Sequence, residues 1–166
     1  MTLGIKLYNG GVEMELKVDI NSYMSLEEAN TIVENELLDT SNEYKDWNSL
    51  SENNKIKLII KGTRMIDSIP FRGVKYNISR VGELQWPRLI NNELIECPLE
   101  IKIALIKQVL RDYTNSSRQE TQLQEIGVKS YSINKASISF SDKNNTKLDN
   151  GIYNDIYFEL LKKWVL

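Results

Sequence analysis

Apolar residues recur with the period of an α-helix in two segments of the first half of the chain. A Ser-x-x-Glu capping box begins at Ser25, and the apolar positions after it predict a helix over residues 26–38. The same box pattern begins at Ser49, and a run of isoleucines then predicts a second helix that ends near Ile66. Pro70 ends any helical continuation.

Two further helices are predicted in the second half. Pro98 suits the first position of a helix, where its missing N–H costs nothing. Apolar positions over residues 99–113 make this third helix the most apolar, and we expect it at the centre of the core. Residues 152–166 predict a short amphipathic helix.

Two segments favour β-hairpins. Residues 3–17 carry apolar positions on both sides of Asn-Gly-Gly, which supplies the positive φ angles of a tight turn. Within about 128–148, residues 130–140 alternate between polar and apolar as strands do. Neither hairpin has an obvious pairing partner inside one monomer, so both are open edges available to another chain.

The predicted fold is mainly α: a small bundle of about four helices with two β-hairpin excursions. The length of 166 residues fits one domain. We divide it into an N-terminal arm (1–22), a helical core (23–113), an extended or loop segment with a hairpin (114–150) and a C-terminal helix (151–166). Residues 114–126 and 141–150 are polar, and we expect disorder there before any assembly.

The charge of the chain is unevenly distributed, although its net value is only −2. Residues 1–49 carry three Lys/Arg against ten Asp/Glu, a net of −7, whereas residues 50–90 carry eight against three, a net of +5. Opposite charges of this kind suit a subunit that meets copies of itself, because they steer association. The alternative is that they are solvated faces that neutralise each other within one monomer.

The composition argues against most enzymes. The chain has no histidine and a single cysteine, Cys97, so histidine acid–base catalysis is excluded and a zinc site of the usual ligands nearly so. No glycine-rich phosphate loop or catalytic set is present. We therefore expect no catalytic residues, no cofactor and no metal. No apolar run is long enough for a membrane helix, so we expect a protein made in the cytoplasm with no membrane partner.

The segment from Lys61 to Arg88 is the strongest candidate for binding. Its basic residues interleave with aromatic ones, a pattern that suits single-stranded nucleic acid and equally suits a protein interface. Two alternatives remain open: Trp86 caps the core, and Arg88 is a solvated charge. The candidate interface or loop residues are Arg64, Asp67, Phe71, Arg72, Gly73, Lys75, Gln85, Trp86, Pro87, Arg88 and Trp164.

Three segments carry a family resemblance. INSYMSLEEAN (20–30), KGTRMIDSIPFRGVK (61–75) and LQWPR (84–88), followed by CPLEIKIALIKQVL (97–110), resemble a family of small bacteriophage proteins often labelled DnaT-like single-stranded-DNA-binding proteins. Their size and motif order are similar to head–tail connector (adaptor or head completion) proteins of tailed phages. One departure is Gly62, where the family usually has alanine.

The resemblance implies a structural subunit of the neck of a phage or of a phage-tail-like particle. Such a subunit forms a ring of about twelve copies that lies between the portal protein and the tail. Its partners would be the portal, tail, stopper or terminator proteins, and the DNA that passes through the channel. Its location would be the virion neck, after synthesis in the bacterial cytoplasm. The alternative is a single-stranded-DNA-binding replication accessory protein.

Overall fold

The structure is a computed structural model that describes residues 15–76, 84–116, 147–148 and 151–166, together with the backbone of four short strands outside those ranges. Its helices are α1 (Leu26–Glu36), α2 (Asn42–Ser49), α3 (Glu52–Asp67), α4 (Leu99–Ser116) and α6 (Asn154–Ile156), and α6 continues directly as a π-helical turn, η1 (Tyr157–Leu161). The prediction of a mainly helical fold with hairpin excursions is confirmed.

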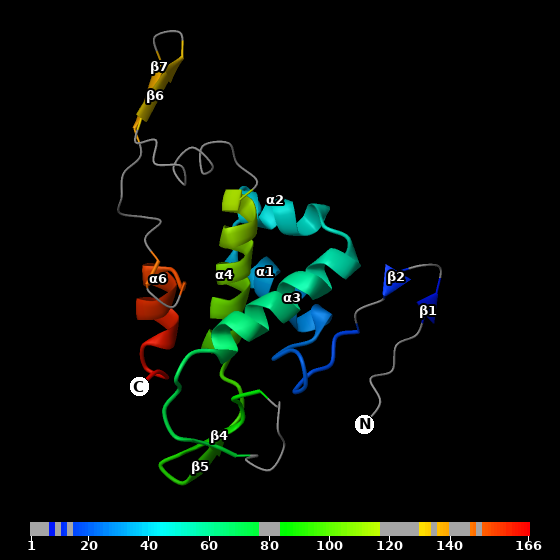
Figure 1. The fold of residues 1–166 in the computed structure, drawn as a ribbon, viewed down its shortest axis with the longest axis vertical. Helices are drawn as coiled ribbons and strands as arrows, with labels where there is room; N and C mark the ends of the chain where they lie inside the picture. Colours follow the sequence, from blue (N-terminus) through cyan, green and yellow to red (C-terminus); the bar gives the residue numbers. More distant parts are fainter. Residues whose placement is uncertain are drawn as a thin grey trace.

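Helix α4 lies at the centre of the helical body, as its apolar sequence predicts. Figure 1 shows α3 crossing α4, with α1 and α2 on one side and the C-terminal α6–η1 segment on the other. Nine residues of α4 are buried, among them Leu105 and Val109. Gly62 of α3 faces these two side chains so closely that a Cβ at this position would lie 2.6 Å from Val109 Cγ1 and 2.7 Å from Leu105 Cδ2.

A three-stranded antiparallel sheet lies at one end of the body, in the order β3 (Val74–Lys75), β4 (Arg88–Ile90) and β5 (Glu93–Ile95). Sequence analysis predicted no strand here. The turn between β4 and β5 consists of Asn91 and Asn92, with φ of 51° and 66°. Two asparagines with positive φ are typical of a two-residue hairpin turn, so the signal for this hairpin was present in the sequence.

Each predicted hairpin forms a two-stranded sheet of its own. The first pairs β1 (Leu7–Tyr8) with β2 (Gly11–Val12), and the second pairs β6 (Ser130–Ile133) with β7 (Ala136–Ser139). Apart from residues 15–17 and 147–148, the remaining residues of the predicted hairpin regions, and most of 117–150, lie outside the described residues. Residues 114–116, predicted to be loosely ordered, instead continue α4, and Thr114 Oγ1 donates to Asp46 Oδ2 at 2.6 Å.

Two helix boundaries differ from the prediction. The capping box proposed at Ser49 is wrong, because Ser49 ends α2 and the cap of α3 is Ser51, whose Oγ accepts from Asn54 N at 3.4 Å. Helix α2 itself was not predicted, since it buries only Trp47 and therefore shows little apolar period. The cap at Ser25 is confirmed, with both hydrogen bonds of the box formed.

The C-terminal helix is shorter than predicted, since its helical part ends at Leu161. The chain then runs back to the segment between α3 and β3. Arg72 N donates to Trp164 O at 2.8 Å, Leu166 N donates to Pro70 O at 3.0 Å, and Phe71 forms an antiparallel bridge with Val165. No helix in the described part of the chain is long and apolar enough to cross a membrane.

Candidate nucleic-acid interface

Residues from the Lys61–Arg88 segment meet the C-terminal segment in one cluster. Phe71, Trp86 and Trp164 form its apolar part. The ring of Trp86 packs edge-on against Phe71, with centroids 5.4 Å apart, and against Trp164, at 5.7 Å. Trp86 is only 3% exposed and Phe71 only 2%. Both rings therefore belong to the core of the monomer and are not accessible for stacking on bases.

Arg88 is buried beside this cluster and is 6% exposed. Its Nε donates to Arg72 O at 2.7 Å, and its NH2 donates to Phe71 O at 2.9 Å and to Gly73 O at 2.8 Å. Its NH1 donates to Gln85 Oε1 at 2.7 Å. Burial lowers the pKa of Arg88, and the nearby Tyr23 and Asp67 oppose that effect.

The guanidinium of Arg88 thus holds three successive carbonyls, which fixes the path of the chain into β3. Gly73 has a φ of 76°, and a Cβ there would lie 2.2 Å from Leu89 O, so only glycine fits this close approach of two backbones. Pro87 follows a cis peptide bond and is half-buried. Lys75 is half-buried in β3, where it is paired in register with Arg88.

Asp67 connects the end of α3 to the same loop. Its carboxylate accepts a short hydrogen bond from the hydroxyl of Tyr23 and a second from Gln85 N at 2.7 Å. Gln85 Nε2 also donates to Asp67 O at 3.2 Å. Burial, with the hydrogen bond to Asp67, raises the pKa of Tyr23. Tyr23 therefore acts here as a hydrogen-bond donor that links the segment before α1 to the end of α3.

Of the predicted site residues, Arg64, Arg72 and Gly73 are exposed. Arg72 Nε donates to Val165 O at 2.8 Å, so this side chain helps to hold the C-terminal segment. The interpretation of Trp86 as a residue of the core fits the structure, and Arg88 is buried rather than a solvated charge. The C-terminal part of the segment, from Phe71 to Arg88, is thus used mainly inside the monomer, and the exposed basic side chains of the segment lie at its start, on α3.

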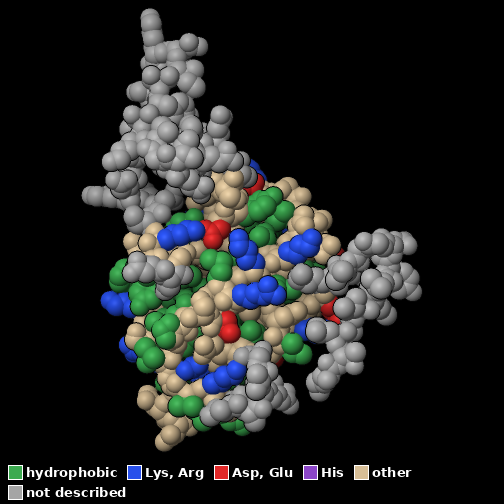
Figure 2. Space-filling model, viewed as in Figure 1, with side chains coloured by type: hydrophobic (Ala, Val, Ile, Leu, Met, Phe, Trp, Pro, Cys, Tyr) green, Lys and Arg blue, Asp and Glu red, His purple; other side chains and the backbone are tan. Residues whose placement is uncertain are grey.

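The available positive surface lies on α3. Lys57, Lys61 and Arg64 are all exposed, and their i, i+4, i+7 spacing places them on one face of the helix. We call them the α3 ridge; they span about 10 Å at 1.5 Å per residue. No Asp or Glu lies between them in the sequence. Figure 2 shows Lys and Arg side chains gathered over α3, with few Asp or Glu among them.

The cations of α4 that lie near α1 and the C-terminal segment are paired with carboxylates. Lys102 lies 2.8 Å from Glu28, Lys107 lies 3.0 Å from Glu36, and Arg111 is bidentate to Asp155. No ion pair involves the α3 ridge within the described ranges. Two carboxylates of the acidic first third, Glu28 and Glu36, are therefore neutralised by α4, while the ridge has no carboxylate partner among the described residues.

Sequence analysis included Lys61 and Arg64 in its basic segment but missed Lys57. The signal that identifies all three is their helical spacing within a helix that was itself predicted. Sequence analysis grouped Phe71 and Trp86 with these charges as candidate binding residues, but both rings are buried inside the protein. Tyr76, 51% exposed, is the accessible aromatic residue that follows β3.

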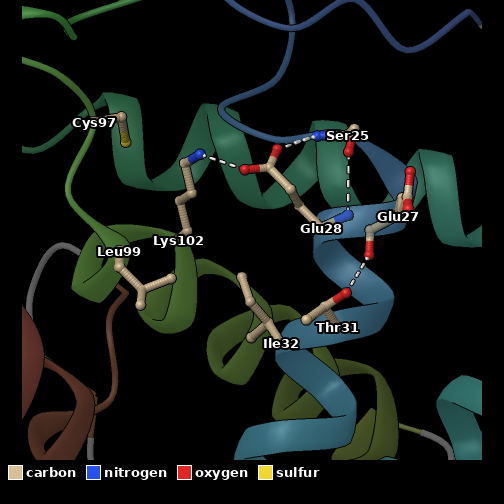
Figure 3. Close-up of a pocket in the computed structure, with 8 residues that line it drawn as sticks. All are labelled: Ser25, Glu27, Glu28, Thr31, Ile32, Cys97, Leu99 and Lys102. Carbon is tan, nitrogen blue, oxygen red and sulfur yellow. Dashed lines mark hydrogen bonds and ion pairs between the residues drawn. The ribbon is translucent and has the colours of Figure 1, made fainter.

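A second surface feature is a hollow of about 360 Å³ between α1 and the start of α4 (Figure 3). Its two facing charges, Glu28 and Lys102, neutralise each other, and the hydrogen bond from Lys102 lowers the pKa of Glu28. Burial raises the pKa of Cys97 to about 12, so the thiol stays protonated at neutral pH. The hollow therefore offers no activated nucleophile. No group of three or more His, Cys, Asp or Glu in the described part could hold a metal.

Comparison with known proteins gives one match. The profile of the family described as "Putative DnaT-like ssDNA binding protein" matches residues 12–165. No curated protein matches the chain. No solved structure matches it either. The matched range includes the cluster of Tyr23, Asp67 and Trp86, the α3 ridge and the C-terminal segment. The chain therefore belongs to the family of DnaT-like ssDNA-binding proteins.

Proposed function

We propose that this protein binds single-stranded DNA through the α3 ridge. The observation that carries the proposal is that Lys57, Lys61 and Arg64 line one exposed helix face without carboxylate partners, whereas cations on α4 are paired. Unpaired Lys and Arg bind phosphates and release counterions, and this gives most of the affinity of sequence-independent binding. The family description supports single-stranded DNA as the ligand.

The expected mode of binding is mainly electrostatic. Sequence-tolerant single-strand binders usually add aromatic stacking to a basic groove. Here the tryptophans of the described chain are buried or half-buried. The exposed aromatic residues of the described chain are Tyr76 and Phe158. We therefore expect modest affinity, a steep dependence on salt and little preference for base sequence.

The test is a titration of a fluorescent oligothymidine at several salt concentrations. Three phosphate contacts on a single strand give a slope of log K against log salt of about −2. The variant K57Q/K61Q/R64Q is expected to lose that contribution, because it removes the ridge and leaves the core untouched.

The matched control is K102Q/K107Q/R111Q, which removes the same number of charges from cations that are already paired. Its affinity for DNA is expected to be close to that of the wild type and higher than that of the ridge variant. Equal loss in both triple variants would mean that net charge alone matters. Absence of binding by the wild type at low salt would overturn the proposal.

A second candidate function is a ring subunit of a phage neck that contacts the portal and tail proteins. The observation that favours it is that the described sheets are short and end in open edges, which could pair between subunits. The family match does not extend to this role. Native mass spectrometry of the protein with its genomic portal partner tests it, and a monomer that never binds portal rings would contradict it.

A further inference from the structure

The three-stranded sheet has one face against the core and one exposed face. On the first, Arg88 is buried and Ile95 packs against the core. Side chains alternate between the two faces along a strand, so the neighbouring Leu89 and Leu94 lie on the second face, and the register places Val74 beside them. These three side chains are 56% (Val74), 37% (Leu89) and 47% (Leu94) exposed. We call this second side the outer face of the sheet.

Tyr76 is the aromatic residue of the outer face. It follows Val74 by two residues, so both side chains lie on the same side of the sheet. The backbone N of Tyr76 donates to Pro87 O at 3.1 Å, which continues the pairing of β3 with β4 by one residue. The side chain is 51% exposed. Tyr76 therefore presents an accessible ring from a backbone that the sheet holds in place.

A series of contacts connects the α3 ridge to Tyr76. Arg64, the last residue of the ridge, precedes Asp67 by about one helical turn, and the Asp67 carboxylate accepts from Gln85 N at 2.7 Å. Gln85 lies two residues before Pro87, the partner of Tyr76. The backbone path through these contacts is on the order of 20 Å, which about six nucleotides cover at 3.4 Å each. Figure 1 shows α3 running toward the end of the body where the sheet lies.

The two edges of the sheet differ in charge. Arg72, just before β3, is exposed, whereas the exposed Glu93 and Glu96 lie in β5 and just after it. A phosphate backbone is therefore attracted to the β3 edge and repelled from the β5 edge. Tyr76 follows β3 directly, so the charges favour DNA on the side of the sheet where its ring lies.

We infer that Tyr76 stacks on a base of the DNA strand whose phosphates bind to the α3 ridge, and that Val74 and Leu89 provide apolar surface beside it. This inference rests on the proposed function and assigns the bases to a separate part of the protein from the phosphates. Stacking on an aromatic ring tolerates any sequence, because every base has a π-face. One accessible ring adds to an electrostatic site without making it sequence-specific.

The test compares Tyr76→Ala and Tyr76→Phe in the full chain, each titrated with oligothymidine and with a strand of equal length that carries phosphates and sugars but no bases. Tyr76→Ala is expected to weaken binding of oligothymidine by about 5- to 100-fold and to leave binding of the abasic strand unchanged. Tyr76→Phe keeps the ring and should bind both strands like the wild type. The dependence of affinity on salt should be the same in all three proteins, because no charge is removed. Circular dichroism and thermal unfolding verify that both variants are folded.

The matched control is Phe158→Ala, which removes a ring that is 56% exposed on η1. Lys162 Nζ lies 5.4 Å from the centre of that ring, and Tyr157 packs edge-on against it, so it is already in use within the protein. This variant should bind oligothymidine like the wild type. Unchanged binding of oligothymidine by Tyr76→Ala, or an equal loss on the abasic strand, would overturn the inference and leave the α3 ridge as the binding site. A wild type that binds neither strand would overturn both proposals.

Discussion

Arg88 shows how one residue can be essential to a fold while resembling a binding residue in the sequence. A basic residue after Trp-Pro suggests a phosphate contact. Yet its guanidinium donates to the carbonyls of Phe71, Arg72 and Gly73, so its hydrogen bonds are used inside the protein. Arginine is suited to this role because its planar group presents five donors in a fixed geometry.

We predict that Arg88→Lys lowers the free energy of unfolding by about 2–4 kcal/mol, because lysine cannot reach all of these acceptors and leaves buried carbonyls unpaired. Urea denaturation measures the change. The control Arg72→Lys loses a single hydrogen bond at an exposed side chain and is expected to cost about 1 kcal/mol or less. Equal costs for the two variants would contradict the role assigned to Arg88.

Gly62 is the second residue whose role becomes clear only from packing. The sequence shows a glycine inside a helix, which usually weakens it. In the fold, Leu105 and Val109 of α4 occupy the space that a methyl group would need, and the nearest atoms include the branch carbon of Leu105. The glycine therefore allows α3 and α4 to approach closely.

We predict that Gly62→Ala lowers the free energy of unfolding by about 1–2 kcal/mol, because the cost of overpacking exceeds the gain in helix propensity. The neighbouring change Lys61→Ala, on the exposed face of α3, is expected to be nearly neutral. Thermal unfolding of both variants measures the difference. A Gly62→Ala protein that is more stable than the wild type would contradict the prediction, because Leu105 and Val109 of α4 would then move aside at no cost in free energy.

At the scale of elements, the long amphipathic helices and the two hairpins β1–β2 and β6–β7 could be predicted from sequence, whereas α2 and the three-stranded sheet were not. Helices α1, α3 and α4 each bury several residues on one face, which produces a clear period. Helix α2 buries Trp47 alone, and β3 pairs through two residues, so neither gives a periodic signal. Asn91 and Asn92 did carry a turn signal that identifies the hairpin of β4 and β5.

The candidate site was predictable only in part, for a related reason. The positive charge of the middle third is visible in the sequence, but its pairing is not. Lys102 and Lys107 meet Glu28 and Glu36 through contacts between distant segments, and such contacts decide which cations remain free. Likewise, the burial of Trp86 depends on Trp164, which is far away along the chain.

The C-terminal segment is held on α4 partly by the bidentate pair of Arg111 with Asp155, at 2.7 and 2.8 Å. The hydrogen bonds from Arg111 lower the pKa of Asp155 below its usual value. A carboxyl whose pKa falls on folding stabilises the fold above its unfolded pKa, about 3.9, and loses that contribution as pH falls through its lower folded pKa.

We predict that Asp155→Asn costs about 1 kcal/mol or less at neutral pH, since the Asp155 side chain is 48% exposed. The difference from the wild type should shrink as pH falls below about 4. Urea unfolding at several pH values measures it. The control Glu159→Gln, on the same segment and without an ion pair among the described residues, should cost less at neutral pH. A difference for Asp155→Asn that grows in acid would contradict the prediction.

At the scale of the whole molecule, the charged residues form two kinds of surface, one where opposite charges are paired and one that is basic and exposed. Carboxylates of the acidic first third are used in part to hold α1 against α4, through Glu28 and Glu36. The α3 ridge, by contrast, is exposed and has no carboxylate partner among the described residues. The net charge of only −2 therefore conceals an exposed basic surface on α3.

The return of the C-terminal segment to the start of the sheet also has a consequence for biosynthesis. Ribosomes deliver the chain from its N-terminus, so α1 to α4 emerge before Trp164 and Val165. Until those residues arrive, Trp86 lacks one of its ring neighbours and Phe71 lacks its backbone bridge. The nascent protein therefore exposes aromatic surface on Phe71 and Trp86 until residues 164 and 165 have been made and can pack against it.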